Sequence, residues 1–319
     1  MRTLFLSAPL ALVACTGAGP GSVYGDDLLP TEEQIRINLP TEGAAKDTHG
    51  GTDFAEYYVV TRNVTEHVNG LVAFVLGTVA YVTTLEPSWS DTEENTAIWG
   101  PYKDSGLDPV ETGVWVRAED DGTYTWAVFQ VPNGGTVEED AIPVVAGVVD
   151  EGSTREAASG VFAVDFDTAS ALDPAVGLVG AFYVEYDYDA DGVRGVAGFE
   201  QYGAEAGEHF DAVYAYDEDY AGAGEMDLAW LDDVDGAGSD EIASLRSRWT
   251  ADGAGRGDAR VLGGDLGSVE VTASQCWGTD FQTSYYADSH DISPAEGDVS
   301  ACAFADAEYP TEASFQIVE

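Results

Sequence analysis

The chain is poor in basic residues. It holds 12 Lys and Arg against 59 Asp and Glu, which gives a formal net charge of −47. A nucleic-acid-binding protein is excluded, because neutralising phosphate groups requires a basic surface. The only lysines are Lys46 and Lys103, which argues against catalysis by a Ser–Lys pair. No apolar run reaches the roughly 18 residues of a membrane-spanning helix, which argues against an ordinary transmembrane protein.

Signatures of catalysis are missing as well. The sequence has no Gly-x-Ser-x-Gly elbow, no His-Glu-x-x-His motif and no phosphate-binding loop. The four histidines, at positions 49, 67, 209 and 290, are scattered and fit surface or loop positions better than ligand positions. Acid pairs are so abundant that no single pair marks a catalytic site. The sequence therefore favours a non-catalytic protein, and an enzyme with an unrecognised site is the alternative. The hydrophobic fraction of 45% excludes a wholly disordered chain.

The N-terminus has the layout of an export signal. Met1-Arg2 is a short positive start, residues 4–11 are a short apolar stretch, and Leu12-Val13-Ala14-Cys15 follows. The apolar stretch is too short to stay as an anchor and suits a cleaved signal peptide. Residues 16–22 have the Gly-rich composition of a flexible linker.

The tetrapeptide Leu12-Val13-Ala14-Cys15 resembles the lipobox of bacterial lipoproteins: an aliphatic residue, a variable one, a small one and a cysteine. The resemblance implies a signal peptide at residues 1–14 and a lipidated tether at residues 15–34. Cys15 would carry the lipid, and the membrane of the cell envelope would be the partner. Thr16, where inner-membrane lipoproteins of this type often have Asp, favours the outer membrane. An ordinary signal peptide with a chance cysteine is the alternative.

The other two cysteines fit the same compartment. Because disulfides persist outside the cytoplasm, we expect Cys276 and Cys302 to be joined, with two buried free thiols as the alternative. The loop-entropy model gives such a bond roughly 3–4 kcal/mol of stabilisation. Cys302 would then pin the acidic, loop-rich segment 289–319 to the strand that holds Cys276.

One long helix is predicted over about residues 52–83. Apolar residues from Phe54 to Val79 recur at spacings of three and four, which is typical of one helical stripe. Thr52 or Asp53 can cap the helix. Its second half, residues 70–82, is apolar nearly all round, so we expect the fold to enclose it. A membrane-inserting segment is the alternative.

The rest of the chain predicts strands. Ile35 to Pro40 alternates as a short strand, and residues 84–112 are loop-like. From residue 113 onward, strand patterns recur regularly, with turns such as Asp121-Gly122 and Asp252-Gly253 between them. Residues 35–319 are therefore expected to form a single β-rich domain.

The expected fold class is mainly β (α+β), a long antiparallel β-meander. Because its apolar face must be covered or closed, we expect a curved sheet or half-barrel wrapped around the one long N-terminal helix. In the order of its elements, this layout resembles the half-barrel carriers of lipids and lipoproteins in the envelope. It is also similar to uncharacterised lipoproteins that pair a lipobox with one helix and a β-meander. No activity follows from either likeness.

Four arginines lie unusually close together in this acidic chain. Arg246 and Arg248 share one face of a strand by the period of two, and Arg256 and Arg260 share a face of the next strand. One hypothesis is an anion-binding site for phosphate, a lipid headgroup or a carboxylate. The other is cross-strand pairing with neighbouring acids such as Asp258 and Glu270.

Two acidic turns resemble fragments of calcium loops. The run from Asp187 to Gly192 matches the first half of such a loop, but Gly198 stands where the twelfth-position Glu is needed. A second run follows residue 231. The candidate metal ligands are Asp187, Asp189 and Asp191 in the first turn and Asp233, Asp235 and Asp240 in the second. Plain acidic hairpins are the alternative, and calcium is the one cofactor considered.

Aromatic residues recur along the predicted strands. They fit core packing, and they also fit an apolar pocket between sheet and helix. The leading hypothesis is therefore a lipid-anchored envelope protein that binds a lipid, another hydrophobic ligand or an anionic ligand, or that has a structural role. A calcium-dependent surface or adhesion module is the rival.

Overall fold

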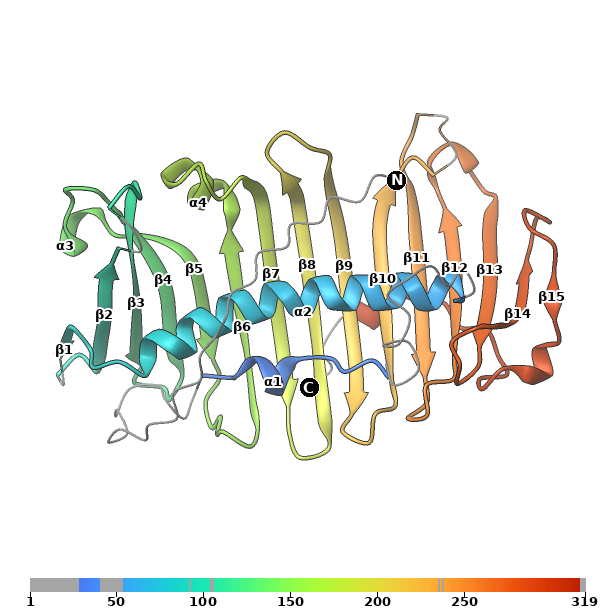
Figure 1. The fold of residues 1–319 in the computed structure, drawn as a ribbon, viewed down its shortest axis with the longest axis horizontal. Helices are drawn as coiled ribbons and strands as arrows, with labels where there is room; N and C mark the ends of the chain where they lie inside the picture. The colour runs from blue at the N-terminus through green and yellow to red at the C-terminus, as the bar shows by residue number, and fades with distance from the viewer. Residues whose placement is uncertain are drawn as a thin grey trace.

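The computed structural model of the chain describes residues 29–40, 54–91, 93–103, 106–234, 236 and 238–315. Within these ranges, all 15 strands lie in one sheet, in sequence order, and each pairs antiparallel with the next (Figure 1). The strands are β1 (Trp89–Asp91), β2 (Thr96–Tyr102), β3 (Val110–Ala118), β4 (Tyr124–Pro132), β5 (Ile142–Val149), β6 (Ala158–Asp165), β7 (Leu178–Tyr188), β8 (Gly192–Ala204), β9 (His209–Asp219), β10 (Gly224–Asp232), β11 (Glu241–Trp249), β12 (Gly255–Leu262), β13 (Glu270–Trp277), β14 (Thr283–Asp288) and β15 (Glu296–Gly297). The expected mainly β meander is confirmed.

The long helix α2 (Glu56–Thr83) crosses the strands along one face of this sheet (Figure 1). At its start, the backbone amide of Tyr57 donates to Gln275 of β13 at 2.8 Å. Just beyond its end, the indole of Trp99 in β2 donates to the carbonyl of Leu85 at 2.9 Å. The shorter elements are α1 (Glu32–Ile35), α3 (Val137–Asp140), α4 (Phe166–Leu172), η2 (Gly264–Leu266), η3 (Val299–Ala301) and η4 (Glu312–Phe315).

The hairpin turns follow the predicted glycine chemistry. β3 and β4 pair out to Ala118 opposite Tyr124, and Gly122 between them has φ 89°. Gly253, between β11 and β12, has φ 92°. Glycine adopts these positive φ values without the steric penalty of a Cβ atom, which is why Asp-Gly marks both turns.

One continuous apolar core lies between α2 and the sheet. From the helix it takes the buried stripe that includes Val68, Leu76 and Val79. From the sheet it takes large aromatic side chains: Trp126, Phe162, Phe182, Tyr214 and Trp249. Each fully buried side chain of this size stabilises the fold by about 1.5–3 kcal/mol. Core packing is therefore what these aromatic residues do.

The sheet is open and uncurled, and the helix lies on it without being wrapped. Helix α2 crosses the sheet from β13 to β2. Because the helix runs across so many strands, an open sheet is wide enough to cover the buried stripe of the helix along its length. The expectation that the fold encloses the second half of α2 is therefore wrong. Phe74 is 70% exposed and Tyr81 is 64% exposed, since a single sheet covers one side of the helix only.

Three local features also differ from expectation. α2 begins at Glu56 with Ala55 at the N-cap and no side-chain cap, and the expected caps at residues 52 and 53 lie outside the described ranges. The loop expected before residue 113 contains β1, β2 and the start of β3. The strand expected from Ile35 is unpaired with the sheet; the side-chain amide of Asn69 on α2 satisfies both backbone groups of Ile37 in its place.

Candidate functional site

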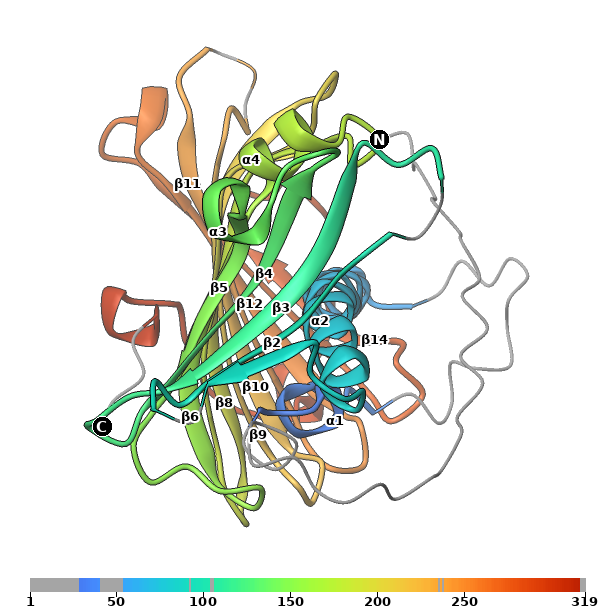
Figure 2. The ribbon, with the colours of Figure 1, turned by 90° about the vertical axis from the view of Figure 1, so that its left-hand side faces the viewer.

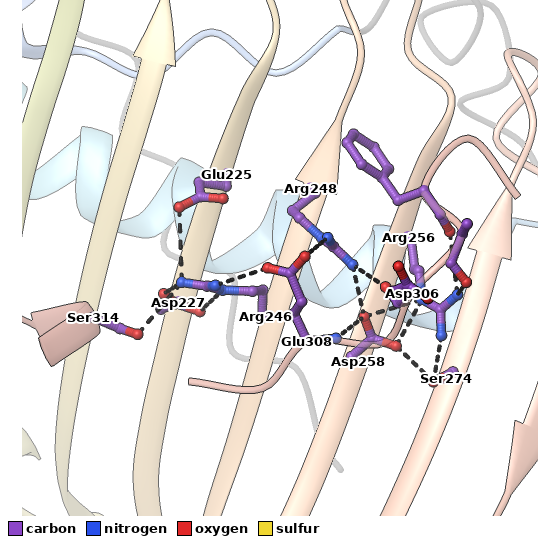
Figure 3. A network of polar contacts seen from close by, with 12 residues as sticks. Glu225, Asp227, Arg246, Arg248, Arg256, Asp258, Ser274, Asp306, Glu308 and Ser314 are labelled. Atoms are coloured by element: carbon purple, nitrogen blue, oxygen red, sulfur yellow. Dashed lines mark hydrogen bonds and ion pairs between the residues drawn. The ribbon is translucent and has the colours of Figure 1, made fainter. Parts of the chain in front are cut away.

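The four clustered arginines lie together on the sheet face opposite α2. Arg246 and Arg248 come from β11, and Arg256 and Arg260 come from β12, with Arg248 directly across from Arg256. Ser247, between the first two, points the other way and contacts Thr61 of α2 at 2.6 Å. The predicted shared faces are thus confirmed, and we call these four residues the arginine strip. Figure 3 shows three of them, Arg246, Arg248 and Arg256.

Asp258 of β12 lies at the centre of the strip and is completely buried. Its carboxylate accepts hydrogen bonds from Arg256 Nε at 2.8 Å and from Arg248 Nη2 at 3.2 Å. It also accepts from the hydroxyl of Ser274 at 2.6 Å and from the backbone amide of Glu308 at 3.1 Å. These ion pairs and hydrogen bonds compensate the free-energy cost of burying the carboxylate.

Arg246 is held by a second buried acid. Its Nε donates to one carboxylate oxygen of Asp227 at 2.8 Å, and its Nη2 donates to the other oxygen. This two-point contact matches the planar guanidinium to the carboxylate. Hydrogen bonding to Asp227, and the nearby charges of Asp227, Glu225 and Glu308, raise the pKa of Arg246.

The C-terminal segment covers the strip. Figure 2 shows α1 and α2 on one side of the sheet and the red turn η4 on the other. We call residues 302–315 the C-terminal strap. Its backbone carbonyls accept from the arginines: Phe304 and Ala305 from Arg256 at 3.2 and 3.0 Å, Asp306 from Arg248 at 2.7 Å, and Pro310 from Arg260 at 2.8 Å.

Side chains of the strap add to these contacts. The carboxylate of Glu308 lies between Arg246, at 3.3 Å, and Arg248, at 2.5 Å (Figure 3). The ring of Phe304 lies 5.0 Å from the guanidinium of Arg248, within the range of a cation–π contact. The strip therefore binds an extended, acidic segment of its own chain.

The predicted disulfide holds the start of this strap. Cys276 and Cys302 are bonded, with their Cα atoms 5.4 Å apart. Cys276 of β13 lies directly across from Arg256 in the sheet register. The bond therefore fixes the strap beside the arginines that it covers.

Of the two hypotheses for the arginines, the structure favours pairing with acids of the chain. Asp258 is one of the expected partners. Glu270, the other, lies across from Leu262 at the start of β13, and no pairing with the strip is seen in the described part of the chain. Sequence reasoning missed Asp227 and Glu308 as partners. The register of β10 and β11 places Asp227 opposite Arg246, but no local motif marks it.

The acidic turns are organised by contacts other than a metal ion. Asp187 pairs with Arg194 at 3.0 Å. Asp189 accepts from the backbone amides of Asp191 and Gly192, at 2.8 and 3.3 Å, and these bonds lower its pKa. Across the described ranges, no group of three or more His, Cys, Asp or Glu side chains is arranged to hold a metal ion.

In the second turn, the organising acid is Glu241, which belongs to the same acidic cluster in the sequence but was not chosen as a metal ligand. Glu241 is buried and accepts from the backbone amides of Val234 and Asp265, at 3.0 and 3.2 Å. The predicted ligands Asp233 and Asp240 flank this arrangement, and Asp235 lies outside the described residues. Glu241 thus closes the loop between β10 and β11.

Two cavities lie outside the interface between helix and sheet. One, of about 430 Å³, adjoins the strip and is lined by Arg194, Asp217, Glu225, Arg246 and Ser314, among others. The other, of about 540 Å³, lies at the rim, where the turns after β9 and β11 meet the segment 38–40. It contains Glu218, whose carboxylate accepts from the amide of Asn38 at 2.6 Å. Burial and the charge of Asp219 raise the pKa of Glu218 to about 7, although the Asn38 bond opposes them.

The expected membrane anchor cannot be placed relative to these contacts. Cys15, the expected lipidation site, lies outside the described residues. Within the described ranges, no helix is long and apolar enough to cross a membrane. Comparisons with protein families, with curated proteins and with solved structures found no match to this chain.

Proposed function

We propose that the chain is a lipid-anchored, non-catalytic protein of the bacterial cell envelope, attached through Cys15, with a structural role. The lipobox-like residues 12–15 support the anchor, and Thr16 favours the outer membrane. The Cys276–Cys302 bond supports export, because disulfides persist in oxidising compartments.

The observation that carries the structural role is the internal use of the arginine strip. Its guanidinium groups bond to Asp227, Asp258 and the C-terminal strap. An anionic ligand would have to displace Glu308 and the carbonyls of the strap. The core between α2 and the sheet is filled by packed side chains, so it gives no support to a lipid carrier.

The anchor is tested in a bacterial host with the full chain and the variant Cys15→Ser. We expect the wild-type protein to fractionate with the membrane and its N-terminal peptide to carry acyl chains by mass spectrometry. Cys15→Ser should lose both, because the thiol is the acceptor for the lipid. Thr16→Ala, which leaves the thiol in place, is the matched control. An unmodified Cys15 in the wild-type protein would refute the anchor.

The structural role is tested by native mass spectrometry of the wild-type protein purified from membranes. A chain without any retained ligand supports the structural role. A stoichiometric lipid or anion that survives purification contradicts it and favours a carrier.

A further inference from the structure

The second half of α2 presents an apolar face to solvent. Phe74 and Tyr81 are seven residues apart, so they lie on the same side of the helix, and both are mostly exposed. Gly70 and Gly77 lie on this side too, and no atom of the described residues lies within 4 Å of where their Cβ atoms would be. We call these four residues, with Leu85 just after the helix, the outer face of α2.

This face carries no charged residue, although the rest of the chain is rich in them. Residues 70–85 contain no Asp, Glu, Lys or Arg, in a chain with 22% charged residues and a net charge of −47. The first half of the same helix exposes the ion pair between Arg62 and Glu66. Exposed apolar patches bounded by polar surface mark sites of interaction with proteins or membranes. Among the described residues, none buries Phe74 or Tyr81, so this face is open to an external partner.

Helix α1, near the start of the described chain, contacts α2 and lies on the same side of the sheet (Figure 2). Leu29, Ile35 and Ile37 pack into the same core as α2, and Ile37 is hydrogen-bonded to Asn69, next to Gly70. Cys15 precedes Leu29 by 14 positions (29 − 15). A fully extended chain of that length reaches at most about 50 Å. A lipid on Cys15 therefore keeps Leu29, which packs into the core beneath α2, within that distance of the membrane surface.

We propose that the outer face of α2 rests on the lipid surface in which Cys15 is anchored, with Phe74 and Tyr81 in the headgroup region. The inference builds on the proposed anchor. Aromatic side chains favour this region because the ring is apolar, and the Tyr hydroxyl stays hydrated. Because the chain is strongly acidic, neutral zwitterionic lipid is the expected surface.

The test reconstitutes the acylated full chain in phosphatidylcholine vesicles that contain a small fraction of diazirine-labelled phosphatidylcholine. After illumination, mass spectrometry locates the lipid cross-links. We expect cross-links within residues 70–85 of the wild-type protein. The double variant Phe74→Ser, Tyr81→Ser should lose about tenfold or more of this labelling, because burying one such side chain is worth about 1.5–3 kcal/mol.

Two further variants make the result specific. Ile292→Ser with Val299→Ser changes side chains that are 68% and 45% exposed elsewhere, and should leave the labelling of residues 70–85 unchanged. Phe74→Leu with Tyr81→Phe keeps the face apolar and should restore it. Because all four substituted positions are exposed, the melting temperature should be the same in every variant.

The outcomes separate this inference from the proposed anchor. If Cys15 is acylated and residues 70–85 are unlabelled, the inference is overturned and the anchor stands. If the purified protein has an unmodified Cys15 and residues 70–85 are still labelled in the vesicles, the anchor fails, and the contact between the outer face and lipid stands without it. If the wild-type protein is a dimer that shields residues 70–85 from the labelled lipid, the occupant is a second copy and the inference is overturned.

Discussion

Replacing Asp258 with alanine is the sharpest test of how the arginine strip is stabilised. Asp258 is fully buried and is shared by Arg248 and Arg256, whose side chains are only 9% and 4% exposed. Removing the carboxylate leaves Arg256 without its acidic partner and leaves Arg248 with Glu308 alone. It also removes the acceptor for Ser274.

The expected loss is about 3–5 kcal/mol of unfolding free energy. That range applies when one partner of a buried ion pair is removed, because the remaining charge stays buried without compensation. Arg248 keeps its ion pair with Glu308, so its charge stays partly compensated and the loss should not exceed this range. Arg256 keeps its bonds to the carbonyls of Phe304 and Ala305, which spread its charge but do not neutralise it.

The assay is equilibrium unfolding in urea, which does not screen charges as guanidinium chloride does, followed by tryptophan fluorescence. The control is Asp187→Ala. Asp187 also pairs with an arginine, Arg194, at 3.0 Å, but the two side chains are 36% and 47% exposed. Exposed pairs contribute up to about 1 kcal/mol. If Asp258→Ala costs no more than Asp187→Ala at an unchanged m-value, the strip does not stabilise the fold as argued.

Three more predictions concern the rim, the strap and the turns. Since the pKa of Glu218 is raised from its ordinary value near 4.5 to about 7, the folded protein binds an extra proton between these values. The unfolding free energy of the wild-type protein should therefore fall, relative to that of Glu218→Gln, as pH rises through about 7. The expected fall is roughly 1–2 kcal/mol after solvent screening. The prediction is contradicted if the melting temperatures of the two proteins depend on pH in the same way. Replacing Cys276 and Cys302 by serine should cost about 3–4 kcal/mol and speed amide exchange in residues 303–310, as measured by mass spectrometry. Calcium in the millimolar range should leave the melting temperature unchanged, because Asp187 and Asp189 already have partners; a rise that Asp189→Asn abolishes would revive the calcium hypothesis.

Local patterns predicted the elements because each depended on neighbouring residues. The three- and four-residue spacing located α2 to within a few residues, and Asp-Gly pairs located hairpin turns that need positive φ values. The helix cap failed as a prediction, since Ala55 begins α2 through its backbone bond to Phe281 of another loop. That bond joins residues 226 positions apart (281 − 55), which no local window contains.

The arginine strip was half predictable for the same reason. Period-two alternation places Arg246 and Arg248 on one face, and the nearby Asp258 could be named as a partner. Glu308 could not be named, because it lies 60 positions from Arg248 and reaches it only after the strap crosses the sheet. The disulfide was the one clue in the sequence, since Cys302 ties the strap to the strand beside Arg256.

A single-layer sheet has two faces to protect, and this chain protects them differently. The face toward α2 is covered by apolar packing around residues such as Trp126 and Tyr214. On the other face, over β10 to β13, the buried groups include Asp227, Asp258, Arg248 and Arg256, under the C-terminal strap. The chain has 12 basic residues for 59 acids, and four of them are placed here. Exposed acids stay hydrated without a partner, whereas a buried carboxylate needs one. Scarce arginine is thus placed against the two buried acids of this face, whereas the buried Glu241 and Glu218 accept from backbone amides, and this pairing is the distribution expected of a structural network.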